Sequence, residues 1–235
     1  MQYTIACMGN HEYPGVVVFD LDGTLVDTIA DIAAAANRAL NRLGFVSIPA
    51  DRCREMVGWG TRVLARLALE HTGGSTDDES VDQLERMITD EYTDQPFVDS
   101  TIYAGIEPLL DGFRDHNIIL AVCTNKSEPI AQRVVHTAFG VDRFDAVVGA
   151  RPGRTPKPSA QPLYECITMS GGDRDSALLI GDSDVDVRTA RAAGVPVYGA
   201  AWGYRGRTHL ETAGADEVFD SPEEILNAIE RLALC

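Results

Sequence analysis

The sequence lacks paired cysteines, long apolar runs and a recognisable leader segment. Its five cysteines are scattered, odd in number and without a Cys-x-x-Cys pair. This pattern argues against a disulfide framework or a zinc site and fits reduced thiols in a cytosol. No apolar run approaches the roughly 18 residues of a membrane span, and no basic start is followed by a long apolar run at the N-terminus. These absences predict a soluble, cytoplasmic protein without membrane association.

Positive charge is also scarce. The net charge is −16 and the pI is about 4.6, which argues against nucleic acid or an anionic membrane surface as a partner. An anionic substrate must therefore meet a local positive site. Only two of the 20 basic residues are lysine, Lys126 and Lys157, and both fall in loops that carry other polar residues of interest. The composition is equally compatible with a monomer and a homodimer.

What is present is a regular alternation of apolar runs and amphipathic segments. Short apolar runs predict buried strands, and apolar residues at helical spacing lie between them. The predicted strands are residues 16–19, 118–123, 145–148, 177–180 and 195–198. Strands that alternate with helices form a parallel sheet covered on both faces. We therefore expect an α/β core, a Rossmann-like three-layer arrangement around a parallel sheet.

One segment departs from this alternation. Residues 27–100 contain no strand pattern, and their apolar spacing predicts three helices, one ending at Gly44, one after Gly60 and one over residues 81–92. We therefore predict an all-helical domain of residues 27–100, named the helical insert below. It interrupts an α/β core formed by residues 1–26 and 101–235.

Polar residues gather at the ends of the predicted strands. Asp20 and Asp22 follow the first strand, Thr124 and Asp182 follow two others, and Lys157 lies in the loop after the third. Two neighbouring carboxylates at the end of a buried strand repel each other unless a cation such as Mg²⁺ compensates them. In open parallel sheets, ligands bind beyond the carboxyl ends of the strands. Carboxylates, a lysine and a divalent metal at one edge suit phosphoryl transfer.

Four motifs carry a family resemblance. They are Asp-Leu-Asp-Gly-Thr-Leu-Val at residues 20–26, Thr124-Asn125, Lys157-Pro158 and Gly-Asp-Ser-Asp-Val-Asp at residues 181–186. In this order they resemble the motifs of the haloacid dehalogenase (HAD) superfamily, and the helical insert resembles its type-one cap. Within the insert, Val-Gly-Trp-Gly at residues 57–60 resembles the phosphoglycolate phosphatase branch of that superfamily.

The resemblance implies a role for each motif residue. Asp20 would attack phosphorus and become an aspartyl phosphate, a known use of carboxylate nucleophiles. Asp22 would protonate the leaving alkoxide and then accept a proton from the attacking water. Phosphate oxygens would be held by Thr124 and Asn125, Gly23 would permit close backbone approach, and Lys157 would neutralise both Asp20 and the transferring group.

The resemblance also implies a Mg²⁺ site. Its ligands would be the Asp20 carboxylate, the Asp22 backbone carbonyl and Asp182, with Asp186 ordering the waters of the ion. Asp186 has an alternative role as a helix-start charge. A shared cation requires Asp20 and Asp182 to lie within about 10 Å of each other.

Three residues and one loop keep alternative interpretations. Arg62 could bind the far end of the substrate, although a solvated helix face is the ordinary role for such a residue. Lys126 is either a surface charge or part of the site, and Trp59 is either core of the insert or wall of the pocket. The family usually has another proline two residues after Lys-Pro, but this sequence has Ala160 there, which leaves the shape of that loop open.

These residues distinguish several reactions of the superfamily. A dehalogenase would not need Asp22, Asp182 and Asp186, and a phosphonate hydrolase needs a cap lysine that residues 27–100 do not contain. A phosphomutase uses the same pair of aspartates and stays an alternative, whereas a non-catalytic scaffold is expected to lose them. We predict a Mg²⁺-dependent phosphomonoesterase, a phosphoric monoester hydrolase acting on a small phosphorylated metabolite, with phosphoglycolate the leading candidate.

Overall fold

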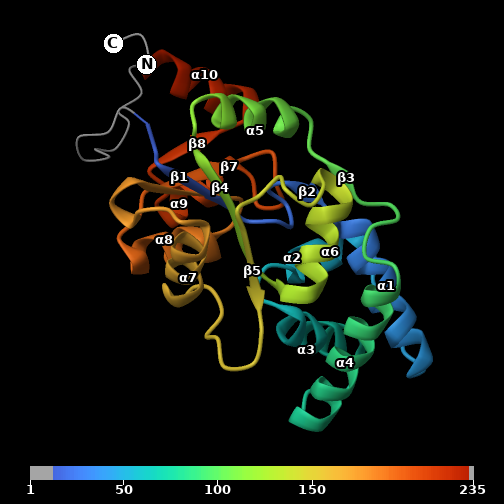
Figure 1. Cartoon of the computed structure of the whole chain (residues 1–235). Coiled ribbons are helices and arrows are strands. Elements are labelled where there is room, and N and C mark those ends of the chain that lie inside the picture. Colours follow the sequence, from blue (N-terminus) through green and yellow to red (C-terminus); the bar gives the residue numbers. More distant parts are fainter. Residues whose placement is uncertain (1–12, 233–235) are drawn as a thin grey trace.

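The computed structural model describes residues 13–232 and is built on one six-stranded sheet in the order β5-β4-β1-β6-β7-β8 (Figure 1). All neighbouring strands in this sheet are parallel. The strands are β1 (Val16–Phe19), β4 (Ile119–Ser127), β5 (Ala146–Ala150), β6 (Ala177–Gly181), β7 (Val197–Ala200) and β8 (Glu217–Phe219). The chain adds strands on one side of β1 and then on the other, so the strand order reverses beside β1, where ligands bind in open α/β sheets.

Helices cover both faces of the sheet. Along β1, Val17 and Phe19 belong to one apolar cluster, and Val16 and Val18 to another, because successive side chains of a strand point to opposite faces. The first cluster includes residues of α5 (Ile106–Asp115), α6 (Glu128–Phe139) and α10 (Pro222–Leu232); the second includes residues of α7 (Gln161–Ser170), α8 (Asp184–Ala193) and α9 (Arg207–Ala213). The predicted three-layer α/β core is confirmed.

The helical insert contains four helices. They are α1 (Ile29–Arg42), α2 (Ala50–Met56), α3 (Thr61–Thr72) and α4 (Asp78–Asp94). In the chain they lie between β2 (Val26–Asp27) and β3 (Thr101–Ile102), which form a short antiparallel pair. The helix α1 packs on α2 and α4, and α3 packs on α4. In Figure 1 these helices lie together at one end of the molecule, away from α5 and α10.

A buried carboxylate connects the two chain segments that run between the insert and the core. Asp31, in the first turn of α1, is 4% exposed and accepts backbone hydrogen bonds from Val98, Asp99 and Ser100. Burial opposes ionisation, but the Ser100 hydroxyl and these N–H groups outweigh it and lower the pKa of Asp31. The chain that leaves the core is therefore fastened to the chain that returns.

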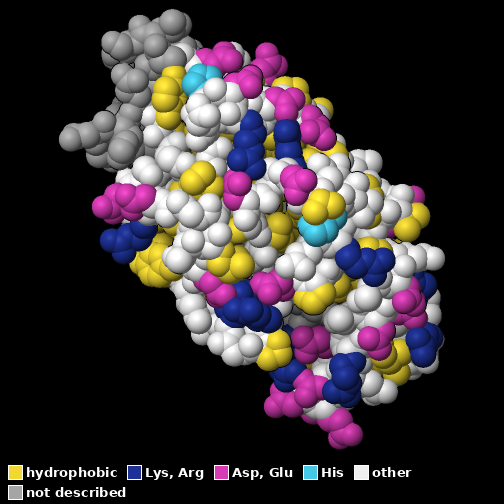
Figure 2. All heavy atoms as spheres, in the orientation of Figure 1, with side chains coloured by type: hydrophobic (Ala, Val, Ile, Leu, Met, Phe, Trp, Pro, Cys, Tyr) yellow, Lys and Arg dark blue, Asp and Glu magenta, His cyan; other side chains and the backbone are white. Residues whose placement is uncertain are grey.

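The predicted elements are present, and the structure adds short ones that the sequence pattern did not indicate. These are α2, α9, β2, β3, β8 and a 3₁₀ turn at Arg174–Ser176. Each is seven residues or fewer, too short for a period to stand out. Among residues 13–232, no helix has the length and apolar character needed to span a bilayer. Figure 2 shows that Lys and Arg side chains on the visible face are interspersed with Asp and Glu.

Candidate active site

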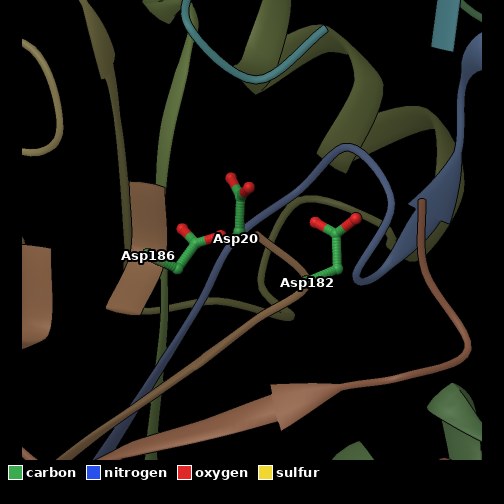
Figure 3. Close-up of side chains that lie close together, drawn as sticks. All are labelled: Asp20, Asp182 and Asp186. Atoms are coloured by element: carbon green, nitrogen blue, oxygen red, sulfur yellow. The ribbon is translucent and has the colours of Figure 1, made fainter. Parts of the chain in front are cut away.

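The sheet brings the predicted polar residues to its carboxyl edge. Asp20 directly follows β1, Asp182 directly follows β6, and Asp186 lies in the first turn of α8. Figure 3 shows their three carboxylates grouped in one small region although they come from separate elements. One oxygen from each lies within 4.8 Å of the others, and all three residues are buried. Asp20 and Asp182 are thus close enough to share one cation, as the sequence analysis requires.

The three buried carboxylates of this cluster repel one another when they are ionised. Burial raises the pKa of Asp20 to about 6, although the Lys157 ammonium opposes the rise. Burial and the nearby charges of Asp186 and Asp20 also raise the pKa of Asp182 well above its usual range. Hard oxygen donors at such short separation are suited to a divalent cation such as Mg²⁺, which would remove the repulsion. The donor set therefore fits the predicted metal.

Lys157 is the cation built into this group. It is 2% exposed, and its Nζ lies 2.9 Å from Asp20 Oδ1 and 2.7 Å from Asp186 Oδ1. It also donates to the carbonyl of Cys123. Burial penalises its charge, but the carboxylates of Asp186 and Asp20 outweigh this and raise the pKa of Lys157. Lys157 is therefore held as a cation against the predicted nucleophile.

Asp186 has the helix-start role that the sequence left open and also pairs with Lys157, whereas its role in ordering metal-bound waters stays a prediction. Its Oδ1 pairs with Lys157, while its Oδ2 accepts hydrogen bonds from the backbone N–H and the hydroxyl of Ser183 at the start of α8. The same carboxylate therefore caps a helix and orients the site lysine.

The second predicted aspartate has a different environment. Asp22 Oδ1 accepts a hydrogen bond of 2.5 Å from the Thr28 hydroxyl and lies 2.9 Å from the Lys126 Nζ. The side chain of Lys126 is only 8% exposed, and its ammonium lies 4.4 Å from the centre of the Tyr92 ring. Lys126 is therefore not a solvated surface charge, and it connects Asp22 to the helical insert.

Asn125 fixes the loop that presents Lys157. Its Oδ1 accepts from the backbone N–H of Lys157, and its Nδ2 donates to the carbonyls of Lys157 and Gly58. Because both amide protons are engaged, a phosphate contact from Asn125 would use its backbone N–H. The neighbouring Thr124 is 4% exposed and accepts a hydrogen bond from the backbone N–H of Lys126.

Gly23 is required by its conformation and its neighbours. Its φ is 87°, a left-handed value that disfavours other residues. A Cβ at this position would also lie 2.5 Å from Asp182 Oδ2. The glycine therefore lets the loop after β1 approach the carboxylate that follows β6.

A cavity of about 70 Å³ lies between the core and the helical insert. Its lining from the core includes Asp20, Asp22, Thr124, Asn125, Lys126, Ile130, Asp182, Tyr204 and Arg205, and its lining from the insert includes Ile32, Gly58, Thr61, Leu64, Ile88 and Tyr92. One wall is thus rich in charge and the other is largely apolar. Such a cavity suits a small anionic molecule with a short organic part.

The loop after β7 supplies residues that the sequence analysis missed. The backbone N–H of Tyr204 donates to Asp182 Oδ2 at 2.7 Å, and the Tyr204 hydroxyl accepts from the backbone N–H of Thr28 at 3.0 Å. Arg205 donates to carbonyls at the end of α2, including that of Val57 at 2.6 Å. A signal was present, because Trp-Gly-Tyr-Arg-Gly at residues 202–206 begins four residues after the end of the predicted strand 195–198.

Arg62 lies elsewhere in this arrangement. Its guanidinium pairs with the carboxylates of Asp78, Asp82 and Glu85 on α4, and it is not among the described residues that line the cavity. Its predicted contact with substrate stays a prediction. Trp59 also lies outside the cavity lining, with the guanidinium of Arg188 5.2 Å from its ring centre.

Comparison with known proteins identifies the family. Residues 17–200 match the family model described as haloacid dehalogenase-like hydrolase. The chain belongs to this family. A phosphoglycolate phosphatase of Mesorhizobium japonicum is 36% identical to it over 193 residues, which cover 82% of this chain and 85% of that protein. A second, from Caulobacter vibrioides, is 34% identical and covers 90% of this chain and 89% of that protein.

The solved structures agree with this membership of the HAD-like family. The crystal structure of a predicted phosphoglycolate phosphatase from Haemophilus somnus superposes with a TM-score of 0.84 at 25% identity, and covers 94% of this chain and 99% of that one. Together with the curated relatives, this confirms the resemblance drawn from the motifs. The protein is a phosphatase, that is, a phosphoric monoester hydrolase.

Proposed function

We propose that this HAD-like phosphatase is Mg²⁺-dependent and hydrolyses phosphoglycolate through an aspartyl phosphate on Asp20. The observation that carries the proposal is the placement of Asp20 between the Lys157 ammonium and the Asp182 carboxylate. The substrate is suggested by relatives named phosphoglycolate phosphatase and by the small cavity with a charged core wall.

Asp20 has the contacts that a nucleophile needs. Its Oδ1 accepts a hydrogen bond from the Leu21 N–H and pairs with Lys157, and none of the hydrogen bonds formed by residues 13–232 ends on its Oδ2. That oxygen is left to attack phosphorus as the bond from phosphorus to the alcohol oxygen breaks. Thr124 and the backbone N–H of Asn125 would hold phosphate oxygens, and Lys157 would balance the charge that accumulates on them.

Asp22 would move the proton. Thr28 and Lys126 both contact its Oδ1, which orients the carboxyl group and leaves its Oδ2 for the leaving group. Asp22 donates a proton to the departing alcohol oxygen. It then accepts one from the water that breaks the bond between phosphorus and Asp20, so the enzyme returns to its starting state.

Asp20, Asp182 and the Asp22 backbone carbonyl would hold Mg²⁺, and Asp186 would order its waters. A bound Mg²⁺ would supply charge neutralisation for the carboxylates and the phosphate. We further propose that residues 27–100 act as a cap that excludes bulk water from the cavity. The contacts of Arg205 and Asn125 with carbonyls of the insert support this role.

The test is a phosphate-release screen over small phosphate esters with Mg²⁺ and with EDTA. We expect phosphoglycolate to be hydrolysed with the highest kcat/KM, only with the metal, and Asp20→Asn to abolish turnover without unfolding the chain. Failure of wild-type enzyme to release phosphate from phosphoglycolate would contradict the proposed substrate. Conversion of hexose 1-phosphates to 6-phosphates without free phosphate would favour the phosphomutase instead.

A further inference from the structure

Lys126 is a buried cation that lines the active-site cavity. Its side chain is 8% exposed, and its Nζ lies 2.9 Å from Asp22 Oδ1. An ammonium group has three N–H donors, and Asp22 is the one carboxylate with which residues 13–232 pair it. Asp22 accepts one of these donors, so the buried ammonium has N–H groups left for a further acceptor in the cavity.

Tyr92, from the helical insert, lines the same cavity and faces Lys126. It belongs to α4, is 4% exposed, and lines the cavity. The Lys126 ammonium lies over its ring, and the buried Tyr92 hydroxyl has no hydrogen-bond acceptor among the described residues. Burial raises the pKa of Tyr92 to about 12, so the hydroxyl keeps its proton. An unpartnered buried donor at a cavity indicates a missing acceptor.

The other cations near the cavity are already engaged. Lys157 contacts Asp20, Asp186 and the Cys123 carbonyl. Arg205 donates to three carbonyls of the insert. Among the described residues that line the cavity, Lys126 is therefore the cation that remains for a second anionic group of a ligand.

We propose that Lys126 and Tyr92 bind a carboxylate on the alcohol half of the substrate and select phosphate esters of α-hydroxy acids. The inference rests on the proposed function, because it takes Asp22 as the group that protonates the ester oxygen. In a phosphorylated α-hydroxy acid the carboxylate carbon is two bonds from that oxygen. The Lys126 Nζ lies next to the Asp22 carboxylate. A substrate carboxylate bound by Lys126 would therefore lie close to the ester oxygen that Asp22 protonates, as this connectivity requires. The Tyr92 hydroxyl donates the second hydrogen bond.

The experiment compares two substrates that differ at this one group. Phosphoglycolate carries the carboxylate, and 2-hydroxyethyl phosphate carries a neutral hydroxymethyl group in its place. We expect wild-type enzyme with Mg²⁺ to prefer phosphoglycolate. We expect Lys126→Met to lower kcat/KM for phosphoglycolate about 30-fold or more beyond its effect on 2-hydroxyethyl phosphate, mainly through KM. Any general effect on Asp22 cancels in this ratio.

Tyr92→Phe carries the test even if Lys126→Met misfolds, because it removes one oxygen and keeps the ring. It should lower the ratio of the two kcat/KM values about 5- to 10-fold. Arg66→Met is a matched control, since Arg66 lies on the insert but pairs with Asp78 outside the cavity lining. The ratio should not change in this control.

Two failures are distinguishable. A wild-type enzyme that does not hydrolyse phosphoglycolate contradicts the proposed function, and the carboxylate site falls with it. A wild-type enzyme that hydrolyses phosphoglycolate while Lys126→Met or Tyr92→Phe lowers both kcat/KM values equally overturns the carboxylate site alone. In that case Lys126 serves only to orient Asp22.

Discussion

The Lys157 ammonium lies 2.9 Å from the Asp20 carboxylate, and both side chains are almost completely buried. A buried ion pair of this kind at the end of β1 adds little net stability, because the desolvation of both charges offsets their attraction. The pair is explained by phosphoryl transfer, in which negative charge grows on the phosphate while Asp20 attacks.

Lys157→Met should lower kcat by about 10²- to 10³-fold, because the variant loses the cation that stabilises the transferring group. Asp20 and Asp186 would also repel each other without it, so the free energy of unfolding should fall by about 3 kcal/mol. Steady-state kinetics and urea unfolding measure the two effects. Arg174→Met, at an exposed arginine, is the control and should change neither quantity. A Lys157→Met enzyme with wild-type kcat would contradict the assignment.

The stability of the metal-free protein should depend on Asp20 between about pH 4 and pH 6. The pKa of Asp20 is raised from 3.8 to about 6 in the folded protein, so the folded state binds the proton more tightly than the unfolded state. Ionisation of the buried Asp20 therefore destabilises the folded protein. This loss of stability is absent below pH 4, grows between pH 4 and pH 6, and is complete above pH 6. In EDTA, Asp20→Asn should therefore be more stable than wild type at pH 7 by about 3 kcal/mol, and about equal to it near pH 4. Urea unfolding at the two pH values measures the difference. An advantage that is the same at both pH values would contradict the proposed ionisation.

Mg²⁺ should stabilise the wild-type protein against heat, since a ligand that binds only the folded state raises its stability. Asp182→Asn keeps the acceptor oxygen for the Tyr204 N–H but removes one negative charge from the site. We expect this variant to lose most of the Mg²⁺-induced rise in Tm and to lower kcat/KM about 10²-fold or more. Asp184→Asn, beside the site but outside the carboxylate cluster, is the matched control and should keep the rise. An equal rise in Asp182→Asn and wild type would exclude Asp182 as a ligand.

Arg205→Met should loosen the contact between the helical insert and the core. The variant leaves the carbonyls of Arg54, Glu55 and Val57 without the guanidinium that now donates to them. We expect kcat/KM to fall about 10-fold and limited proteolysis within the insert to become faster. Arg207→Met, a neighbouring arginine that pairs with Asp220 and Glu211, should leave both readouts near wild type. Unchanged proteolysis in Arg205→Met would contradict a role in closure.

The sequence predicted those parts of the molecule that depend on strong local patterns. The buried strands ahead of Asp20 and Asp182 follow from uninterrupted apolar runs, and their parallel pairing brings those residues to one edge. The proximity of Asp20, Asp182 and Asp186 was therefore predictable from where each lies relative to its strand. Asp186 also lies in the first turn of α8, where its carboxylate both caps the helix and pairs with Lys157.

The remainder depends on contacts between elements that no local pattern encodes. Arg205 reaches the insert across about 150 residues of sequence, and the packing of α4 against the core decides that Tyr92 faces Lys126. The same packing places Arg62 among the acidic residues of α4. A lysine next to a motif has the same sequence signal whether it is solvated or buried, so the role of Lys126 required the three-dimensional arrangement.

The central claim is that phosphorus is transferred to Asp20. Wild-type enzyme is mixed with excess phosphoglycolate and Mg²⁺, quenched in acid within milliseconds, digested and analysed by mass spectrometry. We predict one added phosphoryl group on the peptide that contains Asp20, absent when Mg²⁺ is omitted and absent in Asp20→Asn. Rapid hydrolysis with no phosphoryl group on that peptide, or hydrolysis by purified Asp20→Asn, would contradict the account.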